Sequence, residues 1–279
     1  MKLVFTVPTI ITFMLSSVQS PAQLLGRYAS INGLKMYYEI HGEGFPLVLI
    51  HGGGSTIGTT FGRVLPALAK SNKVIAVEMQ AHGHTDDIDR PMTFEQDADD
   101  IATLLKNLKI EKANIFGFSN GATTTLQLAI RHAHLVNRIV VASTMYKKTG
   151  AIPGFFDAMK NASFESMPNE YKQAFLKINP NQTALYRMYE RDVTRMQNFS
   201  DISEKSIISI QAPTLIIAGN KDVLTPEHAV EMYRKIKNAQ LVILPGGHGD
   251  YMGEITTLKE NTSTFPVVQI IRDFLTENR

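Results

Sequence analysis

The amino-acid sequence predicts an α/β fold built on a mostly parallel, doubly wound sheet with a helical insertion. Short apolar runs alternate along the chain with longer segments of helical periodicity. The runs are apolar on both faces, as in parallel strands that helices cover from both sides. Strand–helix alternation of this kind is typical of doubly wound sheets. The expected strands are Pro46–Ile50, Lys73–Val77, Ala113–Phe116, Arg138–Val141, Pro213–Ala218 and Gln240–Leu244.

An antiparallel hairpin is expected before these strands. Arg27–Ile31 and Lys35–Ile40 flank the dipeptide Asn32-Gly33. Asn-Gly favours the left-handed conformations that a two-residue hairpin turn requires.

Four segments have the apolar stripe or the end signals of helices. In Thr93–Lys109 the apolar residues fall on one stripe, and we expect Asp97, Asp99 and Asp100 on the opposite side. Another segment, Pro226–Ile236, begins after Thr225, a suitable N-cap, with proline at the first helical position. The remaining helices are expected at Gly121–Leu135 and Val267–Leu275.

The segment 146–208 interrupts the alternation, because it contains no convincing buried strand and is rich in Phe, Met, Tyr and Lys. We interpret it as a helical lid over the edge of the sheet, inserted into a core formed by residues 23–145 and 209–279. The alternative is that these helices belong to the ordinary helical layers.

Residues 1–22 have the layout of an export signal: a lysine, a short apolar stretch and small residues before a cut after Ala22. A membrane anchor is the rival interpretation, but Pro8 and the polar residues near position 18 weaken it. A buried N-terminal strand is the third. We therefore expect an exported protein, periplasmic or extracellular, with no stable membrane anchor after the signal is removed.

Composition excludes several classes of function. The chain has no cysteine, which rules out disulfides, thiolate nucleophiles and cysteine metal sites. The 28 basic and 26 acidic residues give a net charge of +2 without a basic block, so nucleic-acid binding has no electrostatic support. A loop containing His82 and His84 with three nearby aspartates could suggest a metal, but we interpret it as solvated charges. No cofactor or metal is expected.

The strongest chemical signal is Gly117-Phe118-Ser119-Asn120-Gly121, which lies directly after one expected strand and before a helix. A nucleophilic serine on such a tight turn needs small neighbours, and glycine occupies both flanking positions. The helix that follows points backbone N–H groups at the site. A second signal is His51-Gly52-Gly53-Gly54, where glycine allows a backbone N–H to approach a ligand oxygen.

An acid and a histidine follow the last two strands. Asp222 lies in Gly-Asn-Lys-Asp after Pro213–Ala218, and His248 lies in Gly-Gly-His-Gly-Asp after Gln240–Leu244. The order Ser119, Asp222, His248 is that of one known hydrolase fold. Asp250 is an alternative acid, although it is close to His248 in the sequence.

Together these motifs resemble the α/β-hydrolase superfamily over nearly the whole chain after residue 22, in particular its small, lidded esterases and lactonases. The segment from Glu78 to Thr85 is similar to the family's D-x-R-G-H-G-x-S loop, with Glu78, Gln80 and Thr85 replacing Asp, Arg and Ser. The resemblance implies a lid after the sixth strand.

The motifs suggest a role for each site residue. Ser119 would attack a carbonyl carbon, His248 would take its proton, and Asp222 would orient His248. Backbone N–H groups of Asn120 and Gly53 would hold the oxyanion, with Gly54 as the alternative to Gly53.

We therefore expect a serine hydrolase of carboxylic esters, lactones or thioesters of small-molecule substrates. Hydrolysis of an amide or a C–C bond by the same triad is an alternative, as in an aminopeptidase. The acids of the insertion, such as Glu190 and Asp192, are scattered as on a solvated helical face. A non-catalytic binding protein on this fold is the third possibility.

Overall fold

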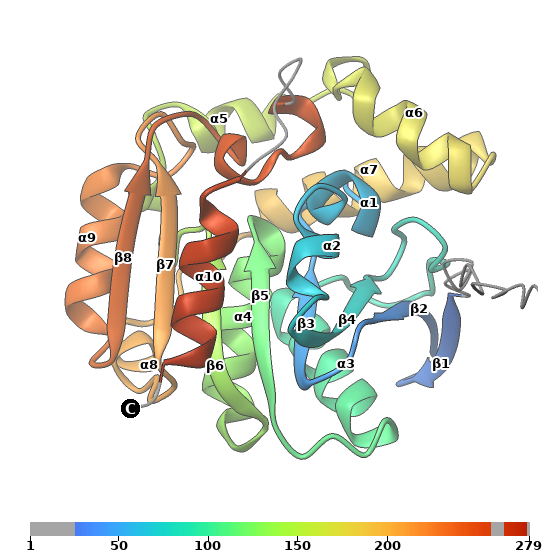
Figure 1. Ribbon diagram of the computed structural model, residues 1–279. Helices are drawn as coiled ribbons and strands as arrows, with labels where there is room; N and C mark the ends of the chain where they lie inside the picture. Colours follow the sequence, from blue (N-terminus) through green and yellow to red (C-terminus); the bar gives the residue numbers. More distant parts are fainter. Residues whose placement is uncertain (1–25, 258–264, 278–279) are drawn as a thin grey trace, which may run out of the picture.

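Figure 1 presents a computed structural model of the protein, in which residues 26–257 and 265–277 are described. Its centre is an eight-stranded sheet of order β1-β2-β4-β3-β5-β6-β7-β8. The predicted export signal, residues 1–22, lies outside the described residues. The strands are β1 (Arg27–Ile31), β2 (Leu34–His41), β3 (Phe45–Ile50), β4 (Asn72–Glu78), β5 (Ala113–Phe118), β6 (Val136–Ala142), β7 (Thr214–Gly219) and β8 (Ala239–Leu244).

The strand pairing confirms the predicted fold class. β1 and β2 form the expected hairpin, with Ile31 opposite Leu34, and β2 also pairs antiparallel with β4. From β4 to β8 every neighbouring pair is parallel. All six predicted parallel strands are present, and their bounds differ from the expected ones by at most two residues.

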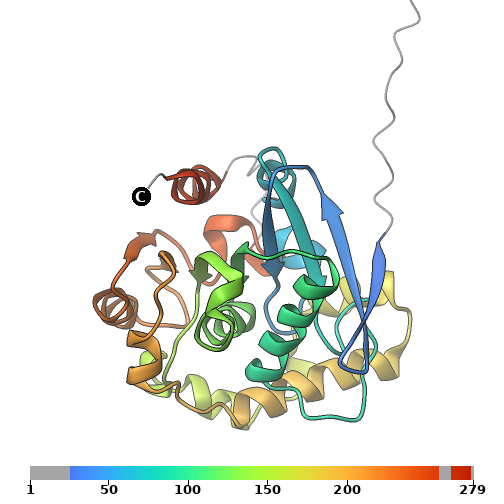
Figure 2. The same cartoon turned by 90° about the horizontal axis from the view of Figure 1, so that it is seen from below.

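Two helical layers cover the sheet (Figure 2). One contains α1 (Ile57–Phe61), α2 (Leu65–Leu68) and α10 (Val267–Thr276); the other contains α3 (Phe94–Asn107), α4 (Asn120–Arg131) and α9 (Pro226–Lys235). Alternate residues of each strand enter opposite cores: Leu47 and Leu49 pack toward α10, whereas Val48 and Ile50 pack toward α3 and α4. This explains why the strands are apolar on both faces.

The expected position of two acids in α3 is wrong. Asp97 and Asp100 are buried, at 2% and 0% exposure, while Asp99 is partly exposed. Each buried carboxylate has a cationic partner, since Arg195 donates to Asp97 and Arg90 donates to Asp100. Both arginines lie outside the helix, so helical periodicity could not reveal these pairs.

Four helices connect β6 to β7: α5 (Phe155–Lys160), α6 (Asn169–Ile178), α7 (Gln182–Gln197) and α8 (Glu204–Ile208). In Figure 1, α5, α6 and α7 cross above the arrowheads of the parallel strands. The short helix α8 lies at the other end of the sheet, beside α9. Three of the four helices therefore lie over the edge at which the parallel strands end.

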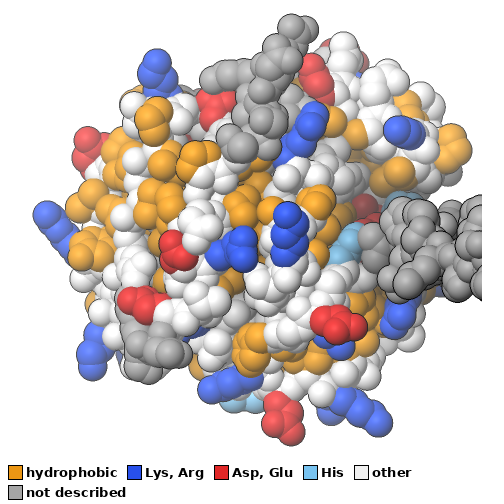
Figure 3. Space-filling model, viewed as in Figure 1, with side chains coloured by type: hydrophobic (Ala, Val, Ile, Leu, Met, Phe, Trp, Pro, Cys, Tyr) orange, Lys and Arg blue, Asp and Glu red, His pale blue; other side chains and the backbone are white. Residues whose placement is uncertain are grey.

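The molecular surface carries no dominant charge on the face seen in Figure 3, where acidic and basic side chains are scattered among apolar ones. Within residues 26–257 and 265–277, none of the helices has both the length and the apolar character needed to cross a bilayer.

Candidate active site

Ser119 occupies the turn between β5 and α4 in a strained backbone conformation, with φ 53° and ψ −120°. Its N–H donates to the carbonyl oxygen of Ala142 at 2.8 Å, which fixes the turn against β6. The two flanking glycines have no room for a side chain. A Cβ on Gly117 would lie 2.2 Å from the carbonyl oxygen of Gly121, and one on Gly121 would lie 2.1 Å from that of Ile50.

The three residues predicted as a triad form one hydrogen-bonded chain. His248 Nε2 lies 3.0 Å from Ser119 Oγ, and His248 Nδ1 lies 2.7 Å from Asp222 Oδ1. Because the carboxylate can only accept, His248 carries its proton on Nδ1 and offers Nε2 to the serine hydroxyl. In space His248 therefore lies between Ser119 and Asp222, although Asp222 precedes His248 in the chain.

Asp222 is held as a carboxylate. Burial raises its pKa, but the hydrogen bond and charge of His248 and the hydroxyl of Ser143 outweigh burial, so its pKa lies below the usual range. The backbone N–H groups of Gly219 and Val223 also donate to it, at 3.1 and 2.7 Å. The alternative acid, Asp250, accepts the N–H of Gly247 at 2.7 Å, whereas His248 donates to Asp222.

Sequence reasoning missed the hydroxyls behind the acid. Ser143 Oγ donates to Asp222 Oδ2 and lies 2.6 Å from Tyr251 Oη. Since Ser143 gives its proton to the carboxylate, it accepts the proton of Tyr251. The one available signal was position: Ser143 directly follows β6, at the edge of the sheet where Ser119 follows β5.

The glycine turn after β3 lies beside Ser119. Gly53 lines the same cavity as Ser119 and Asn120, and its N–H makes no hydrogen bond within the described part of the chain. The N–H of Gly54, the alternative oxyanion donor, donates to Asp192 Oδ2. Asn120 is the first residue of α4, where backbone N–H groups have no partner within the helix. Among the predicted oxyanion donors, the N–H groups of Gly53 and Asn120 are therefore the two that remain available.

A buried ionic cluster lies behind this turn, and it corrects two expectations. His82 is fully buried rather than part of a solvated loop, and Asp192 on α7 is buried rather than on a solvated helical face. His82 Nε2 lies 2.8 Å from Asp192 Oδ2. Arg195 joins Asp192 to Asp97, at 2.5 and 2.8 Å. Asp192 and Arg195 lie one turn apart on α7, but His82 and Asp97 lie about a hundred residues earlier in the chain, so the local sequence gave no sign that the four would meet.

A cavity of about 240 Å³ opens at Ser119. Its polar wall contains Ser119, His248, Asn120 and Asp192. Its apolar wall comes largely from the helices between β6 and β7 and their flanking loops: Met145, Phe155, Met159, Val193, Met196 and Phe199. The site thus pairs a nucleophile with a small, apolar recess of the kind that binds small molecules.

A model of the alpha/beta hydrolase fold matches residues 46–187, about half of the chain. The chain belongs to the alpha/beta hydrolase family. Serine hydrolase BPHL of Homo sapiens is 28% identical to this hydrolase over 250 residues, which are 83% of this chain and 84% of that protein. Pyrrolizixenacetamide deacetylase of Xenorhabdus hominickii is 24% identical over 275 residues, covering 88% and 96%.

Solved structures support the same fold. The enol-lactonase from Burkholderia xenovorans LB400 matches with a TM-score of 0.70 at 23% identity, over 90% of the hydrolase and 100% of that chain. At this identity the likeness shows the architecture alone.

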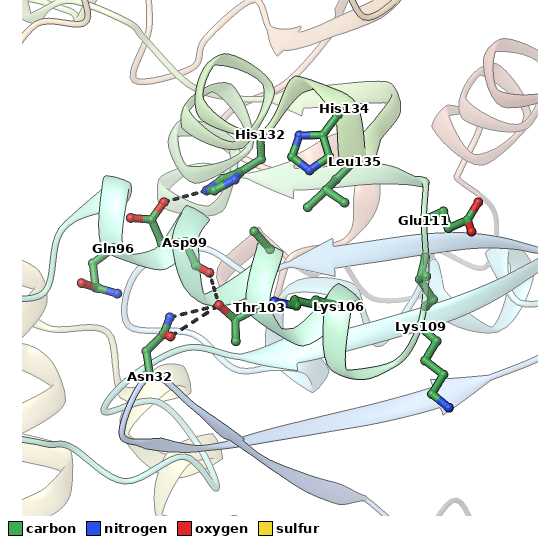
Figure 4. A pocket seen from close by; sticks show the side chains of 12 residues that line it. Asn32, Gln96, Asp99, Thr103, Lys106, Lys109, Glu111, His132, His134 and Leu135 are labelled. Carbon is green, nitrogen blue, oxygen red and sulfur yellow. Dashed lines mark hydrogen bonds and ion pairs between the residues drawn. The ribbon is translucent and has the colours of Figure 1, made fainter.

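A larger cavity of about 780 Å³ lies elsewhere in the hydrolase, between α3 and the loop after α4 (Figure 4). Asp99 there accepts a hydrogen bond from His132, and Asn32 bonds to Thr103. The cavity shares no lining residue with the Ser119 cavity. Volume alone therefore does not single out the cavity at Ser119.

Proposed function

We propose that this hydrolase cleaves carboxylic esters, lactones or thioesters of small molecules through an acyl-enzyme. The observation that carries the proposal is the hydrogen-bonded chain from Ser119 through His248 to Asp222, which opens into the 240 Å³ cavity. Hydroxyl nucleophile, imidazole base and orienting carboxylate are the parts that acyl transfer requires.

The first half-reaction uses these groups in sequence. Ser119 Oγ attacks the carbonyl carbon while His248 Nε2 takes the hydroxyl proton. The negative charge of the tetrahedral intermediate falls on the former carbonyl oxygen, which the N–H groups of Gly53 and Asn120 would hold. His248 then donates its proton to the departing alcohol or thiol, and the acyl group remains on Ser119.

Water completes the cycle. His248 Nε2 takes a proton from water, the resulting hydroxide attacks the acyl carbon, and the proton returns to Ser119 as the acid is released. Asp222 remains ionised throughout and stabilises the imidazolium form of His248.

The size of the cavity sets the expected substrates. A recess of about 240 Å³ lies at the small end of ligand cavities. A short acyl or alcohol group therefore fits beside its methionine and phenylalanine side chains better than a long chain does. We expect p-nitrophenyl butyrate to be turned over with a higher kcat/KM than the palmitate ester.

Two comparisons test the proposal. Wild type should hydrolyse short p-nitrophenyl esters and be labelled by a fluorophosphonate, whereas Ser119→Ala should do neither. Asp222→Asn should lower kcat by about 10⁴-fold, as loss of the orienting acid does in serine proteases, whereas Asp250→Asn should retain most activity. A wild-type protein that resists the fluorophosphonate would contradict the catalytic proposal and favour a binding role.

Amide hydrolysis is a second candidate, favoured by the likeness to pyrrolizixenacetamide deacetylase over most of both chains. The same triad would act, with an amine as the leaving group. The ratio of kcat/KM for phenyl acetate and acetanilide decides between the two: a value near one favours an amidase, and a large excess for the ester favours an esterase.

Export also belongs to the proposal. Residues 1–22 carry the pattern of an export signal. Expression of the full chain in a bacterial host, followed by mass spectrometry of the periplasmic fraction, should yield a chain that begins at Gln23. Recovery of the intact chain from the cytoplasm would contradict it.

A further inference from the structure

The carboxylate of Asp192 reaches across the site from α7 to the glycine turn. Its Oδ2 accepts the N–H of Gly54 and faces His82 Nε2 at 2.8 Å, while its Oδ1 accepts from Arg195 at 2.5 Å. Gly54 and Asp192 are 138 residues apart in the chain. One side chain from the segment over the sheet edge thus holds the backbone of a turn in the core.

Hydrogen-bond geometry assigns the charge of His82. Its Nδ1 lies 2.8 Å from the carbonyl oxygen of Gln80, and its Nε2 faces the carboxylate of Asp192. Both neighbours are acceptors, so both ring nitrogens carry protons and His82 is an imidazolium. Burial lowers its pKa, but the charge and hydrogen bond of Asp192 outweigh burial and raise it.

The neighbouring His51 has the opposite arrangement. Its Nδ1 lies 2.7 Å from the carbonyl oxygen of Gly52, and its Nε2 accepts the N–H of Met79 at 3.1 Å. One donor and one acceptor match a neutral ring, and burial together with the charge of His82 lowers the pKa of His51 to about 3. The other charged groups near Asp192 and His82 are Arg195 of α7 and Asp97 of α3, beside a neutral His51.

The glycine turn needs such an anchor. Three consecutive glycines have wide conformational freedom, and Gly54 has a φ of +65°. A Cβ on Gly53 would lie 2.4 Å from Asn120 Nδ2 and 3.3 Å from Asp192 Oδ2, so a larger residue there would displace the side chain of Asn120. Neighbouring side chains hold the other parts of the turn, since Thr60 and His51 bond to Gly52 and Ser55 donates to the carbonyl oxygen of Gly53. Asp192 is the side chain that holds the N–H of Gly54.

We propose that Asp192 is a positioning residue of the oxyanion hole: by holding the N–H of Gly54, with His82 and Arg195 as its supports, it directs the adjacent N–H of Gly53 toward the reacting carbonyl oxygen. This inference rests on the proposed acyl transfer at Ser119. It assigns to α7 a part in the chemistry as well as in the wall of the cavity. The negative charge of Asp192 does not oppose the oxyanion strongly, because His82 and Arg195 balance it.

The test compares Asp192→Ala and Asp192→Asn with Glu190→Ala, a matched control on an exposed position of the same helix. Each protein is titrated with a fluorophosphonate so that kcat is expressed per active serine. Loss of one oxyanion donor costs about 10²–10³-fold in kcat, and a displaced donor should cost at least about tenfold. We expect Asp192→Ala to lose at least that much in kcat with KM within about threefold of wild type.

The asparagine variant separates positioning from folding. An amide oxygen can still accept from one donor, so Asp192→Asn should recover part of the kcat that Asp192→Ala loses. In a glycine-labelled sample the Gly54 amide proton, which donates to a carboxylate in wild type, should move upfield in both variants. A trifluoromethyl ketone, which places an oxyanion in the hole, should lose affinity by the same factor as kcat/KM.

The outcomes are distinguishable. If wild type is active but both Asp192 variants keep kcat within twofold, or change only KM, the positioning role is overturned while the proposed function stands. If Asp192→Ala does not fold, Asp192→Asn decides by the same criterion. If wild type neither turns over esters nor reacts with the fluorophosphonate, the proposed function fails and the positioning role fails with it.

Discussion

Replacing Ser143 with alanine should reveal how strongly the hydroxyls behind Asp222 stabilise the protein. Ser143→Ala removes a hydrogen bond to a buried carboxylate, worth about 1.5–3 kcal/mol, and leaves the hydroxyl of Tyr251 buried without its acceptor. An unpaired buried hydroxyl costs about 1–3 kcal/mol more. We therefore expect the free energy of unfolding to fall by roughly 3 kcal/mol or more.

The companion variant Tyr251→Phe makes the reasoning quantitative. In the double variant no hydroxyl is left unpaired, so adding Tyr251→Phe to Ser143→Ala should cost nothing or restore about 1 kcal/mol. Made alone, Tyr251→Phe should cost about 1 kcal/mol, since it removes a neutral hydrogen bond. The predicted coupling between the two positions is therefore at least about 1 kcal/mol.

Urea unfolding followed by far-ultraviolet circular dichroism is the suitable assay, because the chain has no tryptophan for fluorescence. The linear dependence of the unfolding free energy on urea should keep its slope in all variants. Activity should fall less than about tenfold in Ser143→Ala, well short of the loss on removing the orienting acid, since the hydrogen bond from His248 to Asp222 is retained. Two results would refute the reasoning. One is that the effects of the two substitutions on the unfolding free energy are additive. The other is that the unfolding free energy of Ser143→Ala lies within about 0.5 kcal/mol of wild type, which is the usual range for neutral surface substitutions.

Three further predictions follow from the same structure. Gly121→Ala should lower stability by about 3 kcal/mol or more, because its Cβ would meet the carbonyl oxygen of Ile50, whereas Gly58→Ala, with 3.9 Å to the nearest atom, should be tolerated in a thermal melt. Arg90→Leu should lower the free energy of unfolding by about 3 kcal/mol, because it leaves Asp100 buried without its cation. Lys160→Ala removes an exposed ion pair with Asp157 and should change the urea midpoint little. The pKa of Asp222 is lowered on folding, so its contribution to stability is present above pH 3.8 and is lost as the pH falls further. The difference in unfolding free energy between wild type and Asp222→Asn should therefore shrink as the pH falls below 3.8, and a constant difference would contradict the assigned charge.

The strands and the tight turn at Ser119 could be predicted from the sequence because their signals are local. A run that is apolar on both faces identifies a strand covered by helices on both sides. The glycines on either side of Ser119 indicate a turn in which the neighbouring backbone passes too close for a side chain. Asp222 and His248 could be added because parallel strands end at one edge of the sheet, which brings the residues after β7 and β8 to the residue after β5.

The supporting groups could not be predicted, because their environments arise only from tertiary contacts. Asp97 has the spacing of a solvent-facing residue, yet Arg195 reaches it from a helix 98 positions later in the chain. His82 and Asp192 each resemble surface residues when considered alone. A charged side chain is buried only where its partner is also present, and the sequence around one partner does not identify the other.

Ser119 and His248 are 129 residues apart and follow β5 and β8, which β6 and β7 separate in the sheet. At about 5–20 residues per second, a ribosome needs roughly 6–26 s to extend the chain from Ser119 to His248. During that interval the nascent polypeptide carries Ser119 without the histidine that the proposed mechanism assigns as its base. Under that mechanism hydrolytic capacity arises abruptly and late in biosynthesis, when the final strand joins the sheet, and shortened products of interrupted translation would lack it.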